Sequence, residues 1–116
     1  MAIAQAKCMN LPIAPRKARL VANMIRGRSV ADARDLLQFT NKLTALPMRK
    51  LVDSAAANAE HAARERHERM SADDMVIVEI MVNEGRTLHR WLSGPRGRAS
   101  RIRKRSCHIE LTIADV

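Results

Sequence analysis

Residues 75–114, MVIVEIMVNEGRTLHRWLSGPRGRASRIRKRSCHIELTIA, contain two alternating apolar segments on either side of a basic one. The first segment, 75–82, has apolar residues at its even positions, which are Val76, Val78, Ile80 and Val82. The second, 107–114, places Ile109, Leu111 and Ile113 at alternate positions. Such alternation is typical of strands with one buried face. We therefore predict two strands that pair as an antiparallel hairpin, the first with its even positions buried.

The connection between these strands, residues 83–106, is too long for a tight turn and contains one concentrated turn signal. That signal is Gly94-Pro95-Arg96-Gly97, near the middle of the connection. The residues on both sides can therefore continue as the two strands of one long hairpin, which forms an arm at about 84–107. With about ten residues in each strand and ~3.3 Å per residue, this arm would protrude about 30 Å.

Positive charge is concentrated in this same connection. The chain carries a net charge of +9 with a pI near 11.0, a balance that favours nucleic acid as a partner. Between Glu84, the only acid there, and His108 lie eight bases: Arg86, Arg90, Arg96, Arg98, Arg101, Arg103, Lys104 and Arg105. Arginine outnumbers lysine seven to one, and its planar fork can hold two phosphate oxygens. The alternative is a solvated basic loop without a target.

Residues upstream of this region predict one strand and two short helices. Residues 2–9 alternate weakly and predict a short strand. A helix is expected at Pro15–Arg26, with proline at its first position and Gly27 at its end. A second helix is expected at Val30–Gln38, after a sequence at 29–32 that resembles a capping box with Asp in place of Glu.

A third, longer helix is expected to run to about His67. It begins either at Asn41, with a bend at Pro47, or at Thr44, with Pro47 in its first turn. Its apolar stripe is Leu43, Leu46, Leu51, Val52, Ala55, Ala56, Ala59 and Ala63. Together these elements predict a single α+β domain over residues 1–116, with three helices packed on a small antiparallel sheet and one long protruding β-hairpin.

The aromatic content restricts the kind of nucleic acid. Phe39 and Trp91 are the only aromatic residues besides histidine, too few for a single-strand reader built on stacked bases. Basic residues carried by a β-ribbon rather than by a recognition helix suit structured RNA that is recognised by its phosphate geometry. Trp91 is either a packing anchor of the arm or a residue that stacks on an RNA base. A sequence-tolerant DNA-binding protein is the competing interpretation, and it rests on charge alone.

A second basic cluster lies in the first predicted helix and just after it. Its members are Arg16, Lys17, Arg19, Arg26 and Arg28. Arg16 and Arg19 are three residues apart and can share a helix face. This cluster is either a second nucleic-acid contact or an ordinary solvated face, and the pattern alone favours neither.

Few residues suggest catalysis, metal binding or a membrane. Cys8, Cys107 and the four histidines have no metal-ligand spacing, so we expect no metal, no cofactor and no enzymatic activity. The longest apolar run, 75–82, is interrupted by Glu79 and falls short of the ~18 residues of a membrane span. No secretory signal is recognisable, and two thiols make no disulfide framework. A reducing, cytoplasmic compartment is therefore expected.

Three blocks of sequence resemble the large-subunit ribosomal protein twenty-two family, in the same order and over nearly the whole chain. The first is Arg16-Lys17-Ala18-Arg19-Leu20-Val21-Ala22 with Ile25-Arg26-Gly27. The second is Ser54-Ala55-Ala56-Ala57-Asn58-Ala59-Glu60-His61. The third is Gly97-Arg98 followed, nine residues on, by His108-Ile109-Glu110-Leu111-Thr112-Ile113.

This resemblance, to the bacterial or organellar type, implies a structural constituent of the large ribosomal subunit that supports early assembly and has no catalytic activity. Its partners would be large-subunit rRNA, neighbouring ribosomal proteins and, at the tip 94–97 lining the exit tunnel, the nascent chain. The expected rRNA contacts are Arg16, Lys17, Arg19, Arg26, Arg86, Arg90, Trp91, Arg96, Arg98, Arg101, Arg103, Lys104 and Arg105. Gly94 and Pro95 replace the basic and small residues usual there, and His89 also departs from the family pattern, so the tip conformation does not carry over.

Overall fold

The computed structural model describes residues 3–115, and within them the chain is an α+β fold, as predicted. Its strands are β1 (Ile3–Leu11), β2 (Val76–Glu84), β3 (Leu88–Ser93), β4 (Ala99–Lys104) and β5 (Cys107–Ala114). Its helices are α1 (Pro15–Ile25), α2 (Val30–Phe39) and α3 (Ala45–Glu65), with short 3-10 turns η1 (Ala72–Asp74) and η2 (Pro95–Gly97). The strand predicted at residues 2–9 is confirmed as β1, although Ala2 lies outside the described residues.

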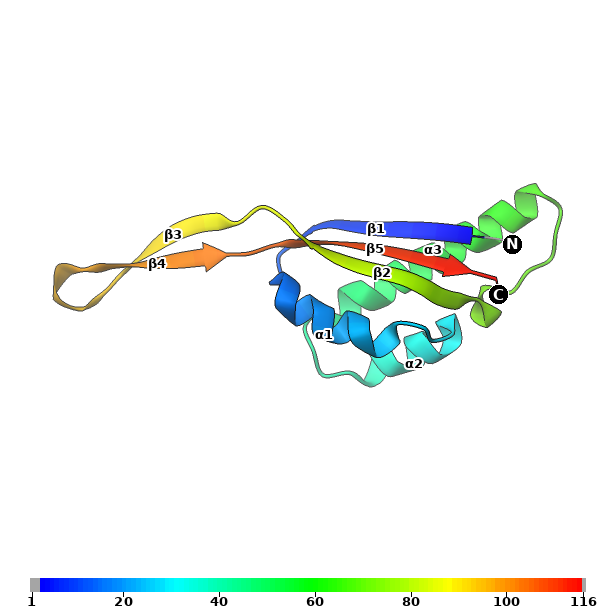
Figure 1. Ribbon diagram of the computed structural model, residues 1–116, viewed down its shortest axis with the longest axis horizontal. Coiled ribbons are helices and arrows are strands. Elements are labelled where there is room, and N and C mark those ends of the chain that lie inside the picture. Colours follow the sequence, from blue (N-terminus) through cyan, green and yellow to red (C-terminus); the bar gives the residue numbers. More distant parts are fainter. Residues whose placement is uncertain (1–2, 116) are drawn as a thin grey trace.

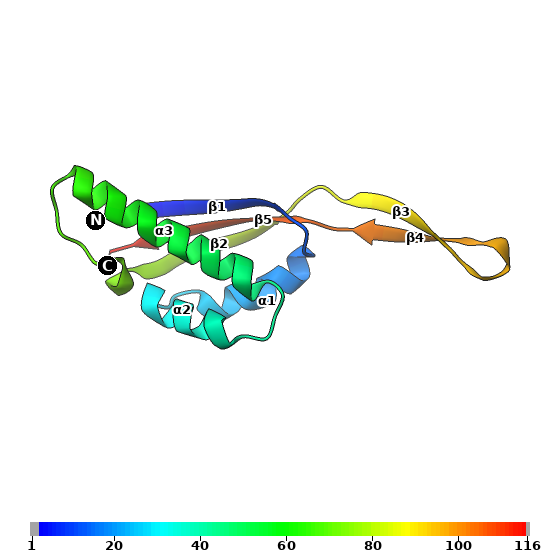
Figure 2. The ribbon, with the colours of Figure 1, turned by 180° about the vertical axis from the view of Figure 1, so that it is seen from behind.

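The body of the molecule is a three-stranded antiparallel sheet in the order β1–β5–β2, with the helices on one face (Figures 1 and 2). The predicted antiparallel pairing of β2 with β5 is confirmed. Strand β5 is central, and its apolar residues Ile109, Leu111 and Ile113 are fully buried beneath the helices. Helix α3 packs on β1 and β5, and α1 packs beside β2. Small residues such as Ala55 and Ala59 let α3 approach the sheet closely.

Strand β2 departs from the predicted burial pattern at its start. Ile80 and Val82 are buried as expected, but Val78 is 49% exposed and Ile77 is buried in its place. The reason is a bulge, because Ile77 pairs with Ile113 whereas Glu79 pairs with the next residue, Thr112. The extra residue reverses which side chains face the core on the upstream side. The prediction that all even positions are buried was therefore wrong at the start of the strand, where Val78 is exposed.

Helix α3 begins at Ala45, with Thr44 in the N-cap position and Pro47 in the first turn. The structure thus selects the second of the two predicted starts, in which proline causes no interior bend. Leu43 and Leu46, predicted as part of the stripe, are 82% and 60% exposed. Leu43 precedes the helix, and Leu46 lies one residue out of phase with Ala45, the position that faces the core.

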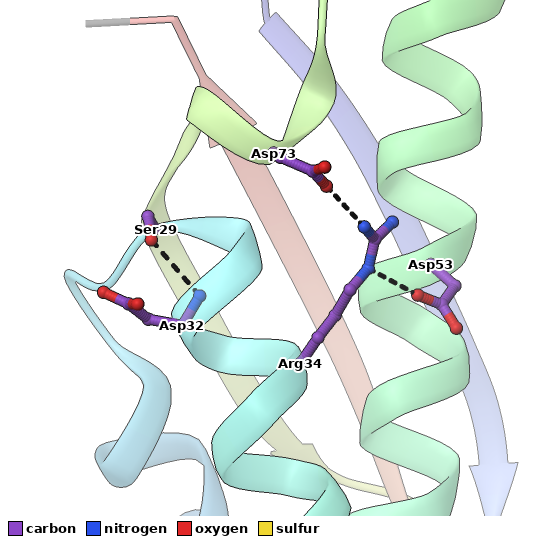
Figure 3. A network of polar contacts seen from close by, with 5 residues as sticks. All are labelled: Ser29, Asp32, Arg34, Asp53 and Asp73. Carbon is purple, nitrogen blue, oxygen red and sulfur yellow. Dashed lines mark hydrogen bonds and ion pairs between the residues drawn. The ribbon is translucent and has the colours of Figure 1, made fainter.

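Helix α2 is attached to its neighbours by polar contacts around Arg34 (Figure 3). The Arg34 Nε group donates to Oδ1 of Asp53 on α3 at 2.8 Å, and Nη1 donates to Asp73 in η1. At the start of α2, the Ser29 hydroxyl accepts the backbone N–H of Asp32 at 3.3 Å, which confirms that residue as the helix cap. These contacts orient α2 between α3 and the loop that leads into β2.

Candidate nucleic-acid interface

The basic segment forms an arm that stands away from the body of the protein. Strands β3 and β4 pair only with each other, and the molecule is 68 Å long but only 26 Å and 16 Å across in the other directions (Figures 1 and 2). Every residue of β3 is exposed, from Leu88 to Ser93. Among the described residues, these two strands therefore pair with no other strand, and the surface of the hairpin is free on both sides.

The register of the arm sorts its side chains onto two chemically different faces. Directly paired residues share a face, and the faces alternate along each strand. One face carries Leu88 and Lys104, Arg90 and Ile102, and Leu92 and Ser100. The other carries His89 and Arg103, Trp91 and Arg101, and Ser93 and Ala99. The first face is aliphatic with two cations, and the second combines one indole with two guanidinium groups and an imidazole.

All eight basic side chains of the arm are exposed, and none of them takes part in an ion pair within residues 3–115. The ion pairs of that part of the chain lie on the body, as in Lys7–Glu110 and Arg66–Glu68. The arm therefore presents its positive charge uncompensated. Like charges on a two-stranded ribbon repel one another, and a polyanion would relieve that repulsion.

The tip of the arm, residues 94–98, is a tight loop with two residues in the left-handed region. Arg96 has φ of 57° and Gly97 has φ of 74°. The N–H of Gly94 donates to the carbonyl oxygen of Arg98, and the N–H of Arg98 donates to that of Pro95 at 3.3 Å. A Cβ at Gly94 would lie 2.9 Å from the Arg98 oxygen, so the close approach requires glycine. The Gly94-Pro95 departure thus has a structural role, because it closes the loop and projects Arg96 outward.

The neck of the arm is held by bonds between Gly85, Arg86 and Ser106. The Gly85 N–H donates to the Ser106 carbonyl at 2.9 Å, and the Ser106 hydroxyl donates to the Arg86 carbonyl at 2.6 Å. Pro15 lines one small hollow together with Glu84, Gly85 and Arg105. The first turn of α1, which carries exposed Arg16 and Lys17, therefore lies beside the base of the arm. The structure thus places these two cations near the basic residues of the arm.

Arg19 on α1 and Arg26, the C-cap residue that follows the helix, make contacts within the protein instead. Arg19 donates from Nε and Nη2 to the carbonyl oxygen of Val82, at 3.3 and 3.1 Å. Arg26 donates from Nη2 to the carbonyl oxygen of Ile80 at 2.9 Å and from Nη1 to Oδ1 of Asn23 at 2.7 Å. Strand β2 is an edge of the sheet, and these guanidinium groups cover its outward carbonyls. This structural role was missed from the sequence, which gave no signal linking α1 to β2.

The remaining ionisable groups form no second centre. Within residues 3–115, no group of three or more His, Cys, Asp or Glu side chains is placed to hold a metal ion. Burial raises the pKa of the Cys107 thiol above its ordinary value of 9.0, and the neighbouring Cys8 adds to this rise while Arg19 opposes it. The Asn10 N–H donates to Nδ1 of His108 at 3.0 Å, so this imidazole is a hydrogen-bond acceptor for the backbone of β1. None of the helices in this part of the chain combines the length and apolar character of a membrane span.

Comparison with protein families agrees with this architecture. The family model for ribosomal protein L22p/L17e matches residues 6–114, a range that includes the basic turn of α1 and the whole arm. The resemblance expected from the three sequence blocks is confirmed, and the family is one of structural rather than enzymatic proteins. The chain therefore belongs to the ribosomal protein L22p/L17e family and is a structural constituent of the large ribosomal subunit.

Proposed function

We propose that residues 1–116 act as one rRNA-binding domain that grips folded large-subunit rRNA with the arm and the first turn of α1. The observation that carries this proposal is the exposed positive charge of the arm. Its eight basic side chains make no ion pair in the part of the chain that the structure describes. Arginine predominates among them, and its fork suits bidentate contact with phosphate oxygens. The cations at the neck extend this surface onto the body.

The shape of the arm supports insertion between RNA segments rather than docking on one flat surface. Both faces are free, and cations point from each, so a ribbon between two rRNA segments can satisfy both. We propose that its tip lines the polypeptide exit tunnel of cytoplasmic ribosomes, where Arg96 meets the nascent chain. We also propose an early role in assembly, because a long arm has access to the rRNA interior only before the surrounding segments close.

Neighbouring ribosomal proteins are proposed to pack on the body rather than on the arm. Phe39, the last residue of α2, and Leu43, in the connection to α3, are exposed large apolar side chains that rRNA phosphates would not favour. Phe39 lines a hollow together with Met24 of α1 and Leu36 of α2, so this apolar surface lies on the helices of the body.

The ionic-strength dependence of binding tests the electrostatic account. If the arm and neck contact about six to ten phosphates, affinity for rRNA should fall roughly 10³- to 10⁵-fold between 50 and 200 mM salt. A flat response would refute the role assigned to the arm. Excess duplex DNA should compete weakly, since shape recognition depends on folded RNA.

Co-sedimentation with the large subunit in a sucrose gradient, with and without a high-salt wash, tests the assignment in cells. The variant Arg98→Gln/Arg103→Gln should be depleted from subunits and their precursors. The control Arg64→Gln/Arg69→Gln removes the same charge from the last turn of α3 and the segment after it, and should sediment like the wild-type protein. This end of α3 lies opposite the arm (Figure 2). Equal depletion of both variants would mean that net charge, not the arm, governs binding.

A further inference from the structure

The face of the arm that carries Trp91 has an ordered geometry without any core beneath it. Trp91 on β3 is directly paired with Arg101 on β4. The Cζ atom of Arg101 lies 5.4 Å from the centroid of the Trp91 ring, within the range of a cation–π contact. The indole is nevertheless 66% exposed, and it lies outside the apolar core of the body. Its packing with Arg101 therefore orients the ring without burying it.

We propose that Trp91 and Arg101 form a stacking site for one unpaired nucleobase of the large-subunit rRNA, a proposal that rests on the rRNA binding proposed above. Arg101 lies over the indole ring, and the exposed surface that the ring keeps can take a planar base. Base stacking on an aromatic side chain tolerates any of the four bases. One indole accepts one base, which agrees with a chain that has a single tryptophan and no tyrosine.

The residues around the indole favour a nucleotide over a polypeptide as the occupant. His89 and Arg103 form the next pair on the same face, toward the neck, so the Arg103 guanidinium lies where the phosphates flanking a stacked base would run. Toward the tip, the next pair on this face consists of two small residues, Ser93 and Ala99. The aliphatic residues that would suit an apolar peptide, Leu88 and Leu92, lie on the opposite face of the ribbon.

Arg101 acts as a positioning residue as well as a phosphate partner. An exposed tryptophan on a free ribbon samples several rotamers, and the guanidinium contact restricts them before RNA arrives. Pre-ordering lowers the entropic cost of binding. Replacing Arg101 by lysine keeps the charge but loses the planar stack, so Arg101→Lys should weaken stacking while leaving the salt dependence of RNA binding unchanged.

Intrinsic fluorescence measures this site directly, because Trp91 is the only tryptophan of the chain. The full-length protein is titrated with a large-subunit rRNA transcript and, separately, with inorganic polyphosphate, which has the charge but no bases. We expect the rRNA to quench Trp91 emission and polyphosphate to bind without comparable quenching. Equal quenching by both polyanions would overturn the proposal, as would rRNA binding in a filter assay with unchanged emission.

Substitutions separate stacking from bulk and charge. Trp91→Leu should weaken rRNA binding about 5- to 150-fold, which corresponds to ~1–3 kcal/mol per stacked base at 1.4 kcal/mol per tenfold change. Trp91→Phe should restore most of the affinity. Leu92→Ala, on the opposite face of the same strand, should bind like the wild-type protein.

Two further results would count against the base-stacking site, and a third would count against the proposed function. Wild-type affinity in Trp91→Leu would refute it while leaving rRNA binding intact. Acrylamide quenching of Trp91 in the complex with the rRNA transcript that matches the free protein would refute it too, since the indole would then still be open to solvent. Complete absence of rRNA binding at low salt would instead refute the proposed function on which the site depends.

Discussion

Removal of the arm should leave the body folded, because no residue from 83 to 106 belongs to the apolar core. Residues 86–105 can be deleted and replaced by Asn-Gly, the preferred two-residue hairpin turn. Gly85 and Ser106 are already joined by a backbone hydrogen bond of 2.9 Å, so their separation fits such a turn. Strands β2 and β5, which carry the core residues on both sides of the deletion, keep their register.

The expected change in the free energy of unfolding is small and can be worked from the structure. The deletion loses the exposed bond from Ser106 to Arg86, worth about 0.5–1.5 kcal/mol. It shortens the loop between Gly85 and Ser106 from about twenty residues to two, which stabilises the closed pair by about 2 kcal/mol. It also removes all eight arm bases, and with them their mutual repulsion. The two opposing terms leave a net change of about +1 kcal/mol.

Thermal unfolding followed by circular dichroism measures this change. For a domain of this size, ~1 kcal/mol corresponds to roughly 4–8 °C, so the shortened protein should melt at the same temperature or slightly higher. Its rRNA affinity at low salt should be largely lost, because its net charge falls from +9 by eight. A fall in melting temperature of more than about 10 °C, or the loss of a cooperative transition, would show that the arm contributes to the core.

Three smaller perturbations test individual contacts. Arg19→Met should destabilise the protein by about 1–3 kcal/mol in urea unfolding, because the carbonyl oxygen of Val82 loses its charged donor. The control Arg16→Met should change the stability by no more than about 0.5 kcal/mol. Equal effects of the two substitutions would contradict the role of Arg19 in covering the edge of β2. Gly94→Ala should shift amide resonances throughout the tip without changing the melting temperature, because its Cβ would meet the Arg98 oxygen at 2.9 Å. The raised pKa of Cys107 means that the folded thiol keeps its proton above pH 9.0 while the unfolded thiol loses it, so stability should fall as pH rises through that range, by at most ~1.4 kcal/mol per pH unit. Cys107→Ala should flatten that part of the slope, and an unchanged slope would contradict the effect of burial.

Local sequence patterns were sufficient for most of the secondary structure. Helix α1 starts at its proline and ends just before Gly27, whose φ is 80°, because both residues have strong backbone preferences of their own. The pairing of β2 with β5 follows from two alternating segments around one turn signal. The excess of arginine in the arm likewise needs no tertiary contact to be recognised, since the residues lie in one stretch of the chain, 86–105.

The bulge in β2 and the start of α3 could not be read in the same way. Val78 and Ile77 are both apolar and β-branched, so either register satisfies the local pattern, and pairing with β5 selects the one that buries Ile77. Asn41 and Thr44 are both acceptable before a helix, and packing against the sheet selects the start that buries Ala45.

For the basic residues, too, some properties follow from local sequence and others from tertiary contacts. Local composition was enough to identify a basic ribbon, because charge, turn residues and alternation are properties of neighbouring residues. The roles of individual cations depend on contacts between distant parts of the chain. Arg19 meets Val82, 63 residues away, and Arg26 meets Ile80, 54 residues away, while Arg16 and Lys17 stay exposed beside the arm. Folding alone decides which guanidinium groups cover a sheet edge and which stay free, because the carbonyl oxygens of β2 reach α1 only after the sheet and helices have packed.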